Sequence, residues 1–185
     1  MRKQLGTKPL RAQAAAAPAP ASAESQIRSF IAKYSPAIAT QLRAARRHMR
    51  ALFPRGFELV YDNYNALAIG YGPSERAGQV ILSIAGYPKW VTLFFLQGKS
   101  LADPHRLLSG AGSRVRSVRL DETATLDASR IAELVERALA PYRTALLAAP
   151  KLATIVKSVS AKQRERKPTP SAPTSKVARR ATRAR

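Results

Sequence analysis

The sequence predicts an α+β fold: a mostly antiparallel sheet of about five strands, with two N-terminal helices and one C-terminal helix packed on one face. Apolar residues recur at helical spacing toward both ends of the apolar-rich region, which indicates amphipathic helices. Between them, short apolar runs alternate with clusters of Gly, Pro, Asn and Asp, which is typical of strands joined by turns. The turns hold about two to eight residues and a parallel crossover needs about a dozen or more, so the strands must be mostly antiparallel.

Two helices are expected before Pro54. The first spans residues 25–34, and the residues on its apolar face are Ile27, Phe30, Ile31 and Tyr34. Ser35 and Pro36 supply an N-cap and a proline at the first helical position, which opens the second helix. The apolar face of that helix consists of Ile38, Leu42, Ala45, Met49 and Leu52. Pro54 and Gly56 end it.

Five strands and a last helix are expected after Gly56. The strands are predicted at residues 57–61, 66–71, 80–84, 90–96 and 115–120. Residues 90–96 are apolar at both parities, which favours a central strand with both faces covered. In the last strand the apolar residues change parity between Val115 and Val118, which predicts a β-bulge. The last helix is expected from about Leu126 to Leu139.

The loop before the last strand is predicted to hold a short helix. Asp103 is a suitable N-cap, Pro104 a suitable first residue, and Gly110 a suitable left-handed C-cap. Gly110-Ala111-Gly112 is not expected to cradle a phosphate, because it would follow the carboxyl end of that helix, which repels anions.

This region resembles the YdhG-like domain family, a bacterial domain of unknown function. The residues that carry the resemblance are Leu93 to Phe95, Gly98, Leu101, Asp103, Pro104, Leu107, Leu108, Gly110, Gly112 and Arg116. The resemblance extends from Gly56 to about Ala140. One branch of the family is frataxin-like, which implies an iron chaperone as one function. That function needs clustered carboxylates, and residues 26–54 contain no Asp or Glu, so it is the least favoured.

The 185 residues are divided into one domain and two basic ends. Residues 1–24, Ala/Pro-rich and basic, and residues 151–185, rich in Lys and Arg, are expected to be disordered, with the α+β domain at 25–150. The formal net charge is +21. Pro18 and Pro20 interrupt a possible export signal, and no apolar run is long enough to span a membrane, so a cytoplasmic protein is expected.

Catalysis and cofactors are not expected. The chain has no Cys and only two histidines, of which His48 stands among arginines and His105 directly follows Asp103-Pro104. Neither a Gly-x-Ser-x-Gly nucleophile motif nor zinc-ligand spacing is present. A non-enzymatic protein without a metal or cofactor is therefore predicted.

Two functional hypotheses follow from the remaining residues. The first is a binding or adaptor module for a small ligand or a protein, with a pocket formed by Arg116, Tyr61, Tyr64 and Trp90. Arg116 could instead hold a structural carboxylate. The second is non-specific association with nucleic acid through the basic tails and the second helix. Its expected contacts are Arg43, Arg46, Arg47, Arg50, Lys162, Arg164, Arg166, Lys167, Arg179 and Arg180.

Overall fold

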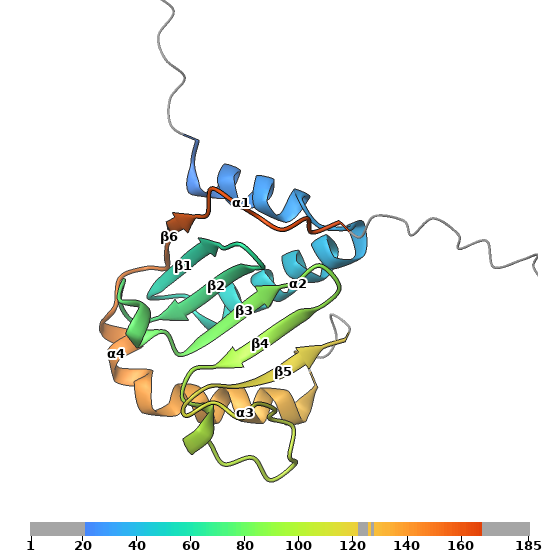
Figure 1. The fold of residues 1–185 in the computed structure, drawn as a ribbon. Helices are drawn as coiled ribbons and strands as arrows, with labels where there is room; N and C mark the ends of the chain where they lie inside the picture. The colour runs from blue at the N-terminus through green and yellow to red at the C-terminus, as the bar shows by residue number, and fades with distance from the viewer. Residues whose placement is uncertain (1–20, 122–125, 127, 168–185) are drawn as a thin grey trace, which may run out of the picture.

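The computed structural model of the protein describes residues 21–121, 126 and 128–167 (Figure 1). The helices are α1 (Ala23–Ala32), α2 (Pro36–Leu52), α3 (Ser129–Leu139) and α4 (Arg143–Ala148). The strands are β1 (Phe57–Asp62), β2 (Leu67–Gly72), β3 (Leu82–Gly86), β4 (Val91–Phe95), β5 (Arg116–Leu120) and β6 (Ala153–Val159). They form a sheet in the order β5-β4-β3-β2-β1-β6, in which only the β1–β6 pair is parallel. The predicted α+β class is confirmed.

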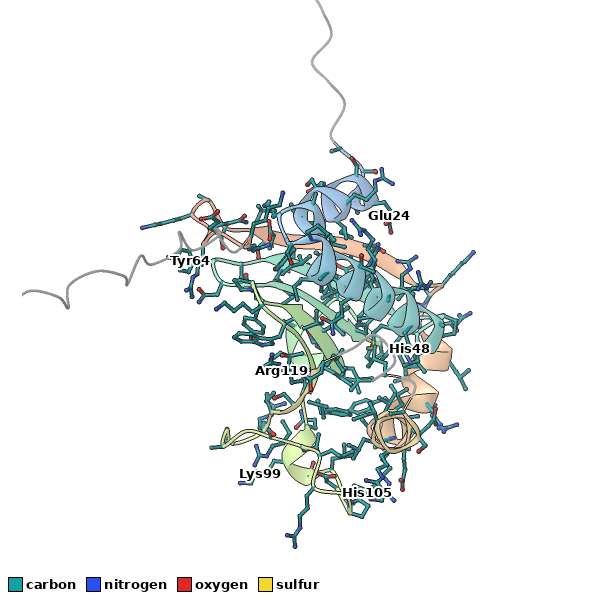
Figure 2. The ribbon with its side chains drawn as sticks, turned by 90° about the vertical axis from the view of Figure 1, so that its right-hand side faces the viewer. Glu24, His48, Tyr64, Lys99, His105 and Arg119 are labelled. Atoms are coloured by element: carbon teal, nitrogen blue, oxygen red, sulfur yellow. The ribbon has the colours of Figure 1, made fainter. Side chains whose placement is uncertain are left out.

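The helices α1, α2 and α3 lie on the same side of the sheet (Figure 2). Their apolar faces join strand residues such as Val60, Ile69 and Ile84 in one hydrophobic core. α2 approaches β3 so closely that a Cβ on Gly86 would lie 2.5 Å from a methyl group of Leu42. Within the described ranges, the helices are too short or too polar to cross a membrane.

The second helix begins as its sequence predicts: Ser35 caps α2, and Pro36 stands in its first turn. α1 begins at Ala23, two residues before the expected start, and Ser22 is its N-cap, so the expected disorder of residues 1–24 is wrong for the last two of them. Between the two helices, the Tyr34 hydroxyl donates a hydrogen bond to the Gly86 carbonyl at 2.6 Å and accepts one from the Leu67 amide at 2.8 Å. This buried phenol therefore fixes the helix connection against the ends of two central strands.

The expected C-terminal boundary at residue 150 is wrong. Residues 153–159 form β6, a sixth strand that extends the sheet beyond β1. Residues 160–167, here called the C-terminal strap, continue the ordered chain: the Arg164 amide donates to the Tyr64 carbonyl at 2.9 Å. The sequence signal was missed because β6 pairs with a strand about a hundred residues earlier, and turn residues report only local pairing. The expected disorder at 1–20 and 168–185 lies outside the described residues.

The predicted bulge and the predicted short helix are also corrected. β5 pairs with β4 in regular register, whereas a register shift occurs between Val60 and Tyr61, where β1 meets β6. Residues 103–110 form a turn without a helix. The Asp103 carboxylate accepts hydrogen bonds from the amides of Leu107 at 3.1 Å and Leu108 at 2.8 Å. These side-chain bonds satisfy amides that a helix would otherwise have to satisfy, and a one-turn helix nucleates poorly.

Candidate functional site

A basic groove lies between α1 and α2. Four arginines of α2 recur at i, i+3, i+4 and i+7 and therefore share one face of the helix, which corrects the expectation that they occupy more than one face. With Arg28 of α1 they line a groove of about 470 Å³, whose lining also includes the buried residues Ile27 and Ile31. The arginines contributed by α2 are Arg43, Arg46, Arg47 and Arg50.

Arg46 has a structural role in this groove. Its guanidinium donates to both carboxylate oxygens of Glu24, at 2.9 and 2.6 Å, and to both oxygens of Glu58, at 3.0 and 2.7 Å. Its side chain is only 12% exposed. The expected role of Arg46 as a nucleic-acid contact is therefore corrected: it joins α1, through Glu24, to β1, through Glu58.

Glu58 is the buried centre of this network. Arg50 donates to it at 2.8 Å, as do the hydroxyls of Tyr71 and Thr154, each also at 2.8 Å. Burial alone would raise the pKa of Glu58, but the hydrogen bond and charge of Arg46 outweigh it, so the pKa is lowered and the group stays ionised. Burial, together with this carboxylate, holds the pKa of Tyr71 well above its usual value.

Three other arginines of the groove, Arg28, Arg43 and Arg47, differ from Arg46 because they are exposed. Among the described residues, Arg43 and Arg47 form no ion pair. The groove thus combines five guanidinium groups with only two carboxylates, and its rim carries cations that the fold does not neutralise.

A second buried ion pair holds the C-terminal strap. Arg166 is 2% exposed and donates a hydrogen bond to the buried carboxylate of Asp62. The same carboxylate accepts hydrogen bonds from the Lys33 ammonium at 2.6 Å and from the Gln163 side-chain amide at 2.7 Å. Arg166 lies 5.2 Å from the centre of the Tyr34 ring, measured from its guanidinium carbon. Arg166 is therefore not a surface contact, which corrects its expected role. The exposed cations of the strap are Lys162, Arg164 and Lys167, whereas Arg179 and Arg180 lie outside the described residues.

The predicted aromatic pocket is not assembled. Arg116 donates to the backbone carbonyls of Gly112 at 2.6 Å and Val115 at 2.8 Å, so it holds its own loop and, among the described residues, pairs with no carboxylate. Tyr61 lies within β1, and Tyr64, which is 46% exposed, lies in the turn after it.

Trp90 instead lines a separate cavity, of about 610 Å³, at the end of the sheet. We call it the corner cavity; it lies between α2 and the ends of β4 and β5. Its lining residues are Pro36, Ala37, Ile38, Thr40, Gln41, Lys89, Trp90, Arg119, Leu120 and Asp121. Tyr61, Tyr64 and Arg116 are not among them, and Tyr64 and Arg119 are well separated (Figure 2).

Several of these roles could have been read from the sequence, and others could not. Glu58 and Asp62 share one strand face with apolar Val60, and a carboxylate in that position must find a buried cation. No local pattern indicates that Arg28 faces α2, or that Arg119 reaches Trp90, since these contacts join distant segments.

The described residues hold no group of three or more His, Asp and Glu side chains placed to bind a metal ion. His105 lies 3.5 Å from Glu133, and both side chains are partly exposed at the surface, so they do not form an enclosed acid–base pair. Comparison with protein-family models, curated proteins and solved structures finds no match for this chain.

Proposed function

We propose that this chain is a non-enzymatic binding protein that takes the phosphate backbone of a nucleic acid in the basic groove. The observation that carries the proposal is the row of exposed arginines on the groove rim, Arg28, Arg43 and Arg47, for which the fold supplies too few carboxylates. Guanidinium groups bind phosphate through paired, charge-assisted hydrogen bonds. All the cations that line this groove are arginines.

A polyanion fits the groove better than a single anion does. Arg43, Arg47 and Arg50 follow one another along α2, and at 1.5 Å per residue they span about 10 Å of helix axis. A linear series of cations suits a chain of phosphates, whose binding releases condensed counterions.

The overall charge supports the same partner. Residues 21–167 hold 23 Lys and Arg against 11 Asp and Glu, a formal net charge of +12 out of the +21 of the whole chain. More than half of the net positive charge therefore lies between residues 21 and 167. Such a field attracts polyanions at long range, and the groove supplies the contact.

The test is a salt titration of oligonucleotide binding by fluorescence anisotropy, from about 50 to about 200 mM salt. The variant combines Arg43→Gln and Arg47→Gln. Its matched control combines Arg76→Gln and Arg130→Gln, two exposed arginines outside the groove that make the same change in net charge. If both groove arginines contact phosphates, the slope of log K against log salt should fall by about 1.4 to 1.8. The control should change it far less.

Two results would contradict nucleic-acid binding in the basic groove. Equal losses in the variant and its control would mean that net charge alone drives binding. Unchanged binding by the variant, together with loss of binding on removing residues 168–185, would assign the contact to the C-terminal residues. A chain that ends at Lys167 keeps the C-terminal strap, so this deletion separates the two contributions without removing Arg166. An acidic polypeptide that binds more tightly than the oligonucleotide would change the class of partner.

A further inference from the structure

Two residues that line the corner cavity, Trp90 and Arg119, belong to an aromatic and cationic stack that the groove does not use. The rings of Tyr87 and Trp90 are stacked, with centroids 5.2 Å apart and planes at 25°. The guanidinium carbon of Arg119 lies 5.2 Å from the centre of the Trp90 ring. The side chain of Arg119 is 60% exposed. One component of the stack, Arg119, is therefore open to solvent.

We propose that the corner cavity takes an unpaired nucleobase, so that the nucleic acid bound by this protein is single-stranded. The inference rests on the proposed function and specifies its substrate class. A planar base stacks on a tryptophan face as a guanidinium does, and Arg119 occupies that position in the free protein. An exposed arginine is displaced at little cost, and its charge then becomes available for the adjoining phosphate.

The charges of the cavity favour a base over a phosphate at this position. Asp121 lines the cavity and pairs with Arg119 at 3.2 Å between Oδ1 and Nε. Its carboxylate would repel a phosphate, but it can accept a hydrogen bond from the amino group of a base. Lys89 supplies a cation at the same cavity, where the flanking phosphates would pass. The volume of about 610 Å³ lies in the range typical of small-ligand pockets.

The cavity and the groove are joined along one helix. Thr40 of α2 lines the corner cavity, and Arg43 and Arg47 of the same helix line the groove. These three residues are exposed and lie within about 10 Å of helix axis. A strand whose phosphates contact the arginines can therefore place a nearby base against Trp90. Bases of a duplex are stacked and paired, so a duplex cannot do so without unpairing.

The experiment uses the intrinsic fluorescence of Trp90, which is the only tryptophan of the chain. The full chain is titrated at about 50 mM salt, where backbone contacts are strong. Its ligands are a single-stranded DNA oligonucleotide, an abasic oligonucleotide of equal length and phosphate count, a duplex, and a nucleoside monophosphate. We expect the single strand to quench the fluorescence and to bind about five- to hundredfold more tightly than the abasic chain. The duplex should leave the fluorescence unchanged.

Variants add a second measurement. Trp90→Leu should weaken single-strand binding toward the level of the abasic chain, and Trp90→Phe should weaken it less. Tyr64→Leu removes an exposed ring outside the cavity and should change nothing. The titration of the unmodified chain does not depend on these variants folding.

Each other outcome overturns the inference in a distinguishable way. In one outcome, base-bearing and abasic strands bind equally and without quenching, while Arg43→Gln with Arg47→Gln still weakens binding. This result would contradict the base site and leave the proposed function standing. Binding of no oligonucleotide would remove both. In another outcome, the monophosphate quenches the fluorescence as strongly as the oligonucleotide does, and the groove variant does not change this quenching. The cavity would then be a small-ligand site.

Discussion

Replacing Arg166 with methionine should destabilise the whole domain, although Arg166 is the second-to-last described residue. In the folded protein its guanidinium pairs with Asp62 and donates to the Asn63 carbonyl at 2.6 Å. Both members of the ion pair are buried, so the loss of one leaves the other without its counter-charge in a medium that solvates charge poorly.

The magnitude follows from the partners that remain. Removing one partner of a buried ion pair costs about 3 to 5 kcal/mol. In Arg166→Met, Lys33 and Gln163 still serve the Asp62 carboxylate, so we expect the lower value, about 3 kcal/mol. In Asp62→Asn, the guanidinium keeps a carbonyl partner at Asn63, and its Nε already has no hydrogen-bond partner among the described residues, so we expect about 5 kcal/mol. The double variant should lose less than the sum, because the two sites are in contact.

The assay is urea unfolding at 25 °C, followed by Trp90 fluorescence. Burial tends to raise the pKa of Asp62, but hydrogen bonds from Lys33, Gln163 and Arg166 outweigh it, so the folded pKa lies below its ordinary value of about 3.9. The contribution of this carboxylate is therefore present above about pH 4 and is lost as the pH falls through the lowered pKa. The difference between wild type and Arg166→Met should accordingly be largest near neutral pH and shrink below about pH 4.

A truncation pair provides the control. A chain that ends at Ser160 lacks Arg166 and should be destabilised at least as much as Arg166→Met. A chain that ends at Lys167 retains the ion pair and should unfold at the urea concentration of the full chain. An Arg166→Met free energy of unfolding within about 0.5 kcal/mol of wild type, the range typical of surface substitutions, would refute a buried, stabilising strap.

Three further predictions test the fold around the site. Gly72→Ala should cost about 1 to 3 kcal/mol in urea unfolding, because its Cβ would lie 2.5 Å from the Gln79 carbonyl oxygen, whereas Gly78→Ala, with no atom within 4 Å, should be nearly neutral. Glu58→Gln should weaken the domain at pH 7 and flatten its acid sensitivity, because the lowered pKa of Glu58 adds stability above about pH 4.5 that is lost as the pH falls; an unchanged pH profile would contradict this. At pH 11, absorbance near 295 nm should report fewer phenolates than the six tyrosines of the chain until urea unfolds it, because the pKa of Tyr71 lies well above 10; a full count in the folded state would contradict its burial beside Glu58.

The elements that the sequence predicted correctly are those with local signals. Ser35 and Pro36 specify the start of α2 through an N-cap and a fixed φ, and both effects act within one turn of helix. β6 has no such signal, because its partner β1 is distant in sequence and the pair is parallel. The short helix predicted after Asp103 failed for a related reason: the same aspartate can cap a helix or close a turn, and only the amides it meets decide which.

The charged residues of the candidate site show the same limit of prediction from sequence. Arg43 and Arg46 are three residues apart and look alike in the sequence, yet Arg43 is exposed and Arg46 holds two carboxylates. Their spacing of three residues places both on one helical face. Spacing does not give the position of Glu24 and Glu58, which decides which arginine is neutralised and which is available to a ligand.

This division of the arginines also determines which substitutions can test binding. Arg46 joins α1 to β1 through Glu24 and Glu58, so its loss would displace the helix that forms one wall of the groove. Weaker binding by an Arg46 variant would therefore follow whether or not Arg46 touches a ligand. Arg43 and Arg47 are exposed and hold no other element in place, so only a contact with the ligand makes their loss weaken binding more than an equal change in charge elsewhere.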